Sequence, residues 1–343
     1  LTLFIGIILS IIILSVIYPS DPGKTSIIDR ITMRSNSVTL TPVNQQHNYA
    51  IADIKKLDSE GTALAWSPDG KRIYYAKNVE GAKDGEEELW VCDTGSTGAK
   101  IDSVIKMYNL GNARWSPDGK KLAFMSGSFE SFTRLLVLDT DSGEILDITP
   151  DKASDAGVTS YDWDKESVEV IMTTNIVSPK IEIYSFLTNK FRKLDLDLKY
   201  CSNAAFFADN GIVFSDVDQS GVYKIYNADR YGRGAYPLAE GQNFIVSADR
   251  CRIAILSDGN TQSGLWVYDN ITKKTKTIRY QPIYSVYWLS NNGMLYSTEE
   301  DCTDDSTYHG LIYCLDQDMN STTVEDAVYP IFVPDQKGDM VAM

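Results

Sequence analysis

The chain has 343 residues, of which 43% are apolar, so it is long and apolar enough to bury a substantial core. Its 47 acidic and 32 basic residues give a formal net charge of −15, and such a surface repels the phosphate backbone of nucleic acids. Two histidines, His47 and His309, leave little material for histidine catalysis or a multi-histidine metal site. The composition thus argues against disorder, nucleic-acid binding and a histidine-bound cofactor.

The first 18 residues (LTLFIGIILSIIILSVIY) carry no charge and show no polar face at the helical period. As a helix they would span about 27 Å, close to the thickness of the hydrocarbon core of a bilayer. We predict a single transmembrane anchor or signal-anchor at residues 1–18, followed by a linker at residues 19–35. A cleaved signal peptide is the alternative, although no A-x-A-like cleavage site follows the apolar run.

A repeated segment is the most informative feature of the remaining chain. Residues 65–75 (AWSPDGKRIYY) recur as residues 114–124 (RWSPDGKKLAF). Weaker copies follow at intervals of 40 to 49 residues and are anchored by Trp163, Phe206, Val246, Trp288 and Phe332. The chain thus contains seven registers of one repeat.

Each repeat has the pattern of four short β-strands. Pro-Asp-Gly suits a tight turn, because Pro presets φ, Asp caps the turn and Gly accepts a positive φ. A second hairpin follows, as in residues 89–94 (LWVCDT) and 265–270 (LWVYDN), where apolar runs end in Asp and turn residues. Four short strands in each repeat of this length predict the blades of an all-β propeller.

Residues 66–71 and 115–120 resemble the TolB-like (WD-like) β-propeller repeat family, and the resemblance extends over residues 36–343. This family occurs in envelope proteins of bacteria and archaea and in the propeller domains of some peptidases, and some of its members are polysaccharide lyases or glycosidases. The resemblance implies a propeller and an envelope location. It does not imply peptidase activity, because the propeller leaves no room for a hydrolase domain. The third register lacks the Pro-Asp-Gly turn, and the fifth has Val246 in place of the aromatic residue.

We expect seven four-stranded blades, with six as the alternative. The register at Phe332 has room for only two strands, whereas residues 37–42 and 49–54 fit the two outer strands of a blade. One blade would then combine strands from both ends of the chain, which closes the ring without an open edge. In the six-bladed alternative, the residues from Phe332 onward form a tail.

The loops that join the second and third strands of the blades are strongly acidic. They hold 14 Asp or Glu residues and three Lys, a net charge of −11 out of the −15 of the chain. Such a face would attract a basic partner or divalent cations, although solvated loop tips give the same pattern. The residues that we expect to face a partner are Glu86, Glu87, Glu88, Glu299, Glu300, Asp301, Asp304 and Asp305.

Residues 216–221 (DVDQSG) have the alternating oxygen ligands of a calcium loop in Asp216, Asp218 and Ser220. The distal Glu of such a loop is missing from its usual place. An ordinary turn is the favoured interpretation, and a weak calcium site is the alternative. No other cofactor is expected.

No G-x-S-x-G, P-loop or H-E-x-x-H motif occurs in the chain. We therefore expect a membrane-anchored, non-catalytic propeller outside the cytoplasm, in the periplasm or at the cell surface of a bacterium or archaeon. Its expected partner is an envelope or surface protein of basic character. The alternatives are a carbohydrate-active enzyme (a lyase or glycosidase) that uses carboxylates at the channel mouth, and a purely structural role.

Overall fold

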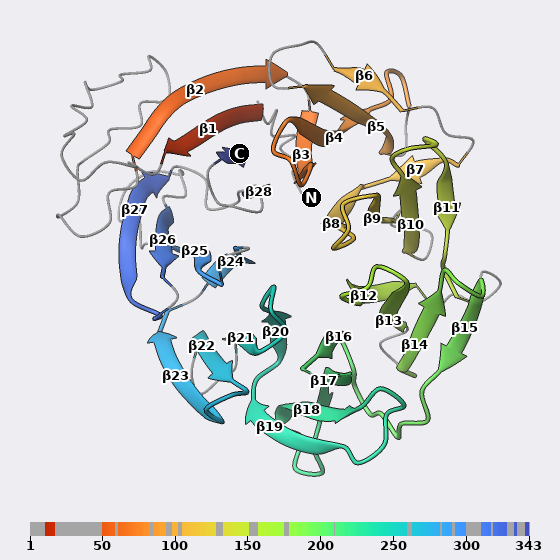
Figure 1. Cartoon of the computed structure of the whole chain (residues 1–343), viewed down its shortest axis with the longest axis vertical. Coiled ribbons are helices and arrows are strands. Elements are labelled where there is room, and N and C mark those ends of the chain that lie inside the picture. Colours follow the sequence, from red (N-terminus) through yellow and green to blue (C-terminus); the bar gives the residue numbers. More distant parts are fainter. Residues whose placement is uncertain are drawn as a thin grey trace, which may run out of the picture.

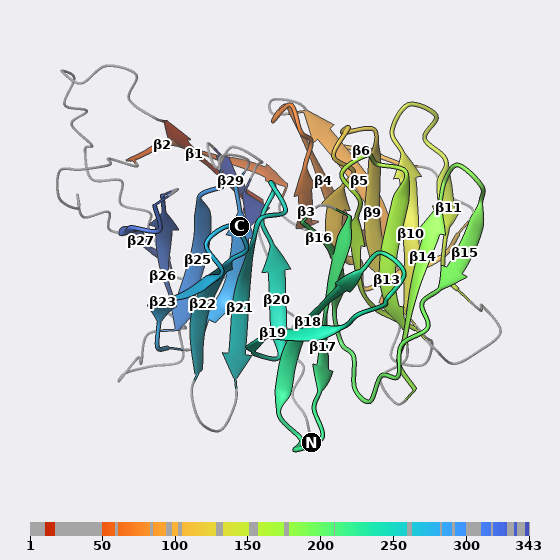
Figure 2. The same ribbon diagram turned by 60° about the horizontal axis from the view of Figure 1, so that its bottom comes forward.

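The structure is a computed structural model. It describes residues 11–17, 50–58, 61–82, 85–93, 98–101, 105–127, 133–150, 157–174, 178–208, 210–258, 263–281, 283–289, 292–299, 310–316, 318–327, 333–334 and 340–342. Its sheets stand in a ring around a central axis (Figure 1), and their strands run between the two faces of a disc (Figure 2). The prediction of an all-β propeller is confirmed.

Six blades are each built from consecutive antiparallel strands. Blades 1 to 3, with inner strands first, are β3 (Gly61–Trp66), β4 (Arg72–Asn78), β5 (Glu86–Asp93) and β6 (Ala99–Lys100); β8 (Gly111–Trp115), β9 (Lys121–Ser126), β10 (Arg134–Asp139) and β11 (Ile145–Asp147); and β12 (Val158–Trp163), β13 (Glu169–Thr174), β14 (Lys180–Ser185) and β15 (Lys190–Lys193). Blades 4 to 6 are β16 (Ala204–Phe207), β17 (Gly211–Val217), β18 (Tyr223–Asp229) and β19 (Tyr236–Glu240); β20 (Asn243–Val246), β21 (Arg252–Asp258), β22 (Ser263–Asp269) and β23 (Lys274–Arg279); and β24 (Ile283–Trp288), β25 (Met294–Glu299), β26 (Gly310–Leu315) and β27 (Ser321–Ala327). In blade 1, β7 (Met107–Tyr108) also pairs with β5.

A further sheet, which we call the closing sheet, completes the ring with strands that are not all consecutive in the sequence. Its strand order is β2 (Ala50–Asp58), β1 (Ile11–Ile17), β29 (Met340–Ala342) and β28 (Val333–Pro334). Strand β1 pairs with β2 along its whole length and with β29 through Ile13, Leu14 and Ser15. The propeller thus has six blades of consecutive strands rather than seven, and the two ends of the chain share the remaining sheet.

The prediction of an N-terminal transmembrane helix is wrong for the described part of that segment, because Ile11–Ile17 forms strand β1. This strand consists mostly of Ile and Val, which favour an extended backbone, and a short apolar run fits a buried strand as well as a helix. Among the described residues, no helix is long and apolar enough to cross a bilayer. The predicted linker at residues 19–35 and the predicted strand at residues 37–42 lie outside the described residues.

The Ser-Pro-Asp-Gly segment forms the turn between the first two strands of a blade, as predicted. In blade 1, the hydroxyl of Ser67 donates to Asp69 Oδ1 at 2.6 Å and accepts the backbone N–H five residues further on at 2.9 Å. Gly70 has a φ of 68°, a conformation that favours glycine. Blade 5 builds the same turn from a degenerate copy, with Ser247 donating to Asp249 at 2.6 Å.

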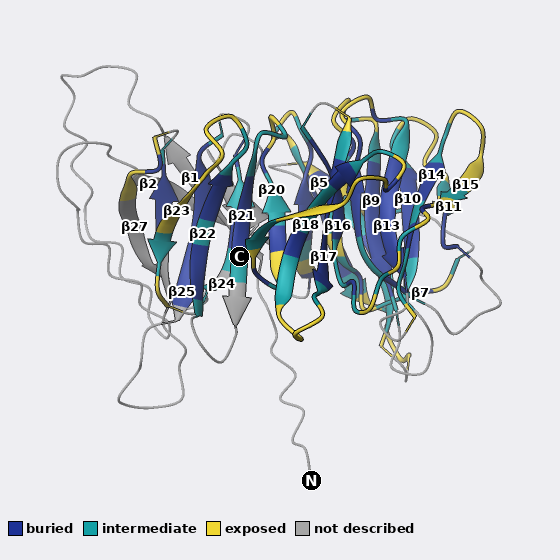
Figure 3. Ribbon diagram, turned by 90° about the horizontal axis from the view of Figure 1, so that it is seen from below, coloured by how far each residue is buried: buried dark blue, intermediate teal, exposed yellow. Residues whose placement is uncertain are grey.

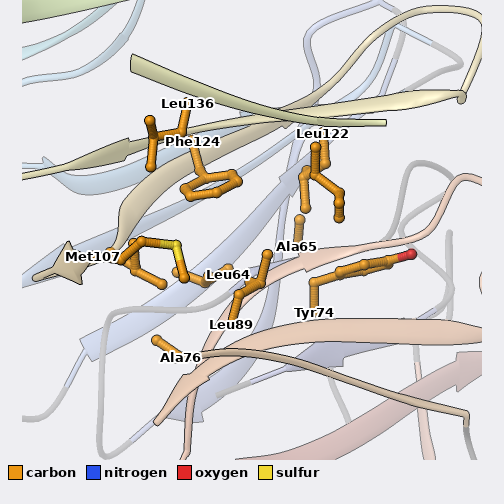
Figure 4. Packing of buried hydrophobic residues seen from close by; sticks show 11 residues of the cluster. Leu64, Ala65, Tyr74, Ala76, Leu89, Met107, Leu122, Phe124 and Leu136 are labelled. Carbon is orange, nitrogen blue, oxygen red and sulfur yellow. The ribbon is translucent and has the colours of Figure 1, made fainter. Parts of the chain in front are cut away.

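Apolar side chains pack between neighbouring blades. Figure 3 shows that the middle of the strands is buried and that the turns at the two faces are exposed. The cluster between blades 1 and 2 (Figure 4) contains Leu89 of blade 1 with Leu122 and Phe124 of blade 2, and all three are fully buried. The tryptophans at the start of the repeated turns are buried or partly buried: Trp66, Trp115, Trp163 and Trp288.

Candidate functional site

Bonds between inner strands connect successive blades. The indole N–H of Trp163 in blade 3 donates to the carbonyl of Arg114 in blade 2 at 3.1 Å. The indole N–H of Trp288 in blade 6 donates in the same way to Ile245 in blade 5 at 2.9 Å. Such bonds satisfy buried donors and also fix the spacing of the blades.

An axial network of Arg114, Asp162 and Arg250 joins four blades through their inner strands and turns. The carboxylate of Asp162 forms an ion pair with Arg250, and its second oxygen lies 3.7 Å from Arg114 Nη1. Arg250 also donates to the carbonyls of Trp163 at 2.6 Å and Phe206 at 3.2 Å. The backbone N–H of Phe206 donates to Asp162 Oδ2 at 3.2 Å.

The axial network becomes more exposed toward Arg114. The side chains of Asp162 and Arg250 are 11% and 16% exposed, whereas that of Arg114 is 42% exposed. A charge with so little solvent is stable only when it is paired and hydrogen-bonded, and Asp162 has both kinds of partner. Its carboxylate therefore bridges neighbouring blades.

A second charged cluster surrounds an open pocket of about 540 Å³ between blades 3 and 4. Arg230, in the turn between β18 and β19, donates to Glu169 at 2.8 Å and to Asp164 at 3.4 Å. One guanidinium group thus bonds to two carboxylates of the neighbouring blade. We call this cavity the blade 3–4 pocket, and it is lined by Asp164, Glu166, Val168, Glu169, Asn210, Asp229, Arg230, Tyr231 and Arg233.

Asp164 is almost completely buried in the wall of the blade 3–4 pocket, with a side chain 2% exposed. Its Oδ1 accepts the backbone N–H groups of Val168 and Glu169, both at 2.8 Å. Burial raises the pKa of this carboxyl, while the two backbone bonds and the nearby Arg230 oppose that rise.

Tyr231 stands at the mouth of the blade 3–4 pocket and is 57% exposed. The guanidinium groups of Arg192 and Arg233 each lie 5.0 Å from the centre of its ring. Arg192 also donates to the carbonyl of Arg230 at 3.1 Å, and Asp229 accepts the backbone N–H of Tyr231 at 2.8 Å. These contacts hold an exposed aromatic ring in a defined position.

The acidic residues expected to face a partner lie partly in strands. Glu86, Glu87 and Glu88 belong to β5, and Glu299 ends β25. Glu86 pairs with Lys106 at 3.1 Å, and Glu88 pairs with Lys100 at 2.5 Å. Part of the acidic charge of blade 1 is therefore compensated within the chain.

Glu87 points to a different neighbour. Its carboxylate accepts the backbone N–H of Leu110 at 2.5 Å, and burial raises the pKa of Glu87. This glutamate thus serves a structural bond between blades 1 and 2. The other expected partner residues, Glu300, Asp301, Asp304 and Asp305, lie outside the described residues.

The three residues of the candidate calcium loop have separate roles. Asp216, buried in β17, accepts the backbone N–H groups of Lys199 and Tyr200. Asp218 caps the following turn by accepting the N–H of Ser220 at 2.8 Å and pairs with Lys224 at 2.9 Å. The Lys224 bond lowers the pKa of Asp218 to about 2. Among the described residues, no group of three His, Cys, Asp or Glu side chains has the geometry of a metal site.

Sequence reasoning missed Arg250 and Arg230. Arg250 has a φ of 61° at the turn position that Gly70 occupies in blade 1, so an arginine in a glycine register was a signal available in the sequence. Arg230 gave no such signal. Its partners Asp164 and Glu169 lie 66 and 61 residues earlier in the chain, and no local pattern connects them.

No family model matches the chain. A curated protein, the uncharacterized peptidase YuxL of Bacillus subtilis (strain 168), is 28% identical over 113 residues, or 32% of this chain. The match covers 17% of YuxL, so the chain spans less than a fifth of that protein.

Solved β-propellers resemble the structure over most of its length. TolB from Acinetobacter baumannii has a TM-score of 0.51 at 17% identity, covering 80% of this chain and 63% of TolB. An oligogalacturonate lyase from Vibrio parahaemolyticus has a TM-score of 0.63 at 9% identity, covering 96% and 97%. The β-propeller domain of the Trilobed protease from Pyrococcus furiosus, described as having an open velcro topology, has a TM-score of 0.56 at 15% identity, covering 80% and 87%. At such identities the likeness concerns the fold. The chain is therefore a β-propeller with TolB among its structural neighbours, which confirms the fold that its repeats predicted.

Proposed function

We propose that this chain is a non-catalytic binding propeller of the cell envelope, which presents its loops to a protein partner outside the cytoplasm. The observation that carries the proposal is the state of Asp162, the carboxylate on the inner strand of blade 3. It forms ion pairs with the guanidinium groups of Arg250 and Arg114 and accepts a hydrogen bond from one backbone amide. A ring held together in this way presents its loops in fixed positions, which lowers the entropy cost of binding a partner.

The enzymatic alternative calls for a pair of carboxylates free to act on a glycosidic bond. The carboxylate of Asp162 is already paired with Arg250 and Arg114, which favours the binding function over catalysis by this carboxylate. The likeness to an oligogalacturonate lyase concerns the fold, since identity is 9%. Incubating the protein with oligogalacturonate and with neutral polysaccharides tests this alternative, and chain shortening would favour it over the binding function.

The face that carries the loops between second and third strands is the proposed partner surface. Glu80 lies in such a loop of blade 1 and is exposed, whereas Asp141 is exposed in a turn on the opposite face. A photo-crosslinking residue at position 80 should capture a protein in cells, and the same residue at position 141 should not. Absence of any adduct at position 80, or equal capture at both positions, would contradict the proposal.

A membrane anchor at residues 1–18 is not part of the proposal, because the closing sheet uses Ile11–Ile17 as a strand. The same residues cannot span a bilayer and pair with β2 and β29 at once. Fractionation of cells, together with a reporter fused to the C-terminus, separates the two arrangements. A carbonate-resistant membrane fraction with an extracytoplasmic reporter supports the anchor. A freely released chain supports the strand, and a cytoplasmic reporter would contradict the envelope location.

A further inference from the structure

The blade 3–4 pocket arises where the repeated turn changes its chemistry. In blade 1, Ser67 and Asp69 bond to each other, so the turn satisfies its own polar groups. In blade 3, Asp164 stands in the serine position and its carboxylate accepts the backbone N–H groups of the turn directly. Glu166 stands in the position of Asp69, and its one contact among the described residues is Lys165 at 3.6 Å. The carboxylate of Glu166 is therefore available to the pocket that it lines.

Blade 4 adds groups that both donate and accept hydrogen bonds. Asn210 lines the pocket from the turn between β16 and β17, and Tyr231 lines it from the turn between β18 and β19. Among the described residues, neither the carboxamide of Asn210 nor the hydroxyl of Tyr231 makes a hydrogen bond. The same holds for the two Nη atoms of Arg233, whose Nε bonds to Asp229 at 2.9 Å. The wall thus offers an acceptor in Glu166, donors in Arg233, and groups that both donate and accept in Asn210 and Tyr231.

The lining of the pocket holds four carboxylates and two guanidinium groups, and two cations beside it, Lys165 and Arg192, bring the total charge of the site close to zero. Each carboxylate in the wall lies beside a cation: Asp164 and Glu169 beside Arg230, Asp229 beside Arg233, and Glu166 beside Lys165. Arg192 adds a further cation at the mouth through its contact with the ring of Tyr231. A small anion would be repelled by the carboxylates of the wall, and a small cation would be repelled by its guanidinium groups. An apolar ligand would leave the polar groups of the wall unpaired.

We propose that the blade 3–4 pocket binds a neutral sugar. Each sugar hydroxyl both donates and accepts, so a single ligand satisfies Glu166, Asn210, Tyr231 and Arg233 without adding charge to a nearly balanced site. The volume of about 540 Å³ falls in the range of small-molecule pockets. This site lies on the face opposite to the proposed protein-binding loops, so the proposal goes beyond that function and stands or falls separately.

Binding of small sugars to the purified full chain tests the proposal, in a detergent without a sugar headgroup. The probes are maltose, cellobiose and N,N′-diacetylchitobiose, compared with digalacturonate as an anion and trilysine as a cation. Saturation-transfer NMR at millimolar ligand concentrations detects each of them. At least one neutral disaccharide should bind, more tightly than either charged probe.

Three variants locate the binding site without disturbing the turns. Tyr231→Phe keeps the ring and removes only the hydroxyl, Glu166→Gln keeps the shape and removes the charge, and Asn210→Gly suits the φ of 69° at that position. Each should weaken sugar binding by about fivefold, the effect of one hydrogen bond. Asp141→Asn, in an exposed turn of blade 2, is the matched control and should leave binding unchanged. Failure of all three sugars to bind, tighter binding of a charged probe, or sugar binding that the three variants leave intact would each overturn the proposal.

Discussion

Removing the carboxylate of Asp162 should destabilise the propeller more than any exposed ion pair does. In Asp162→Ala, the guanidinium of Arg250 keeps its two carbonyl acceptors but loses its anion, in a place where its side chain is 16% exposed. Loss of one partner from a buried pair costs about 3–5 kcal/mol, and the remaining carbonyls place this case near 3 kcal/mol. For a chain of 343 residues, that corresponds to a fall in Tm of roughly 4 °C.

Thermal unfolding followed by circular dichroism measures this effect, with Asp229→Ala as the control. Asp229 pairs with Arg233 at the surface, where the side chains are 42% and 74% exposed, so Asp229→Ala removes a solvent-screened ion pair and the caps of one turn but leaves no buried charge unpaired. The double variant Asp162→Ala/Arg250→Met should regain part of the loss, because it leaves no unpaired buried charge. The reasoning is refuted if Asp162→Ala lowers the Tm no more than Asp229→Ala, or if the double variant is less stable than the sum of its single changes.

Three further predictions use matched positions in the repeat. Trp163→Phe should cost about 1–2 kcal/mol more in unfolding free energy than Trp115→Phe, as measured by urea denaturation. The indole N–H of Trp163 is bonded across blades, whereas that of Trp115 is buried and has no hydrogen-bond partner among the described residues. Equal costs would contradict this. Gly119→Ala and Gly143→Ala both place a side chain at a positive φ. An added Cβ at Gly119 lies 3.0 Å from a proline of the preceding blade, whereas one at Gly143 meets nothing within 4 Å, so Gly119→Ala should be the less stable variant by about 1 kcal/mol. Equal losses of stability would show that the proline moves aside. The pKa of Asp218 is lowered from 3.8 to about 2 in the folded state, so its contribution to stability should be present above pH 4 and lost as the pH falls toward 2. In Asp218→Asn, the Tm should therefore fall less steeply over this pH range. An unchanged fall in Tm would assign the acid sensitivity to other groups.

The fold could be predicted from the sequence because two turns keep their full motif. Residues 66–71 and 115–120 set the register, and their spacing located the degenerate copies, including the one around Asp249. The N-terminal segment was interpreted wrongly because the apolar run Ile11–Ile17 satisfies both a membrane helix and a buried strand. Only pairing with β2 and β29, which lie far away in the chain, distinguishes the two.

The sites could not be predicted in the same way, because their partners are distant in sequence. Counting acidic residues in loops identified Glu88 as a partner contact, but its carboxylate meets Lys100, which lies beyond the next turn. Asp162 and Arg250 are 88 residues apart, and the register of the repeat gives the distance between blades but not the side chains that cross it. A net charge therefore indicates how a surface behaves as a whole and not which of its charges are free.

The departures from the repeated turn explain where this propeller acquires chemistry of its own. In a regular turn the Ser hydroxyl bonds to the Asp carboxylate of the same turn, as in Ser67 and Asp69. Arg250 replaces the glycine of that turn and reaches Asp162 two blades away. Asp164 replaces the serine and meets Arg230 of the next blade, while Glu166 of the same turn lines the pocket. Because the ring keeps its six blades with these irregular copies in place, the irregular turns add chemistry without loss of the fold.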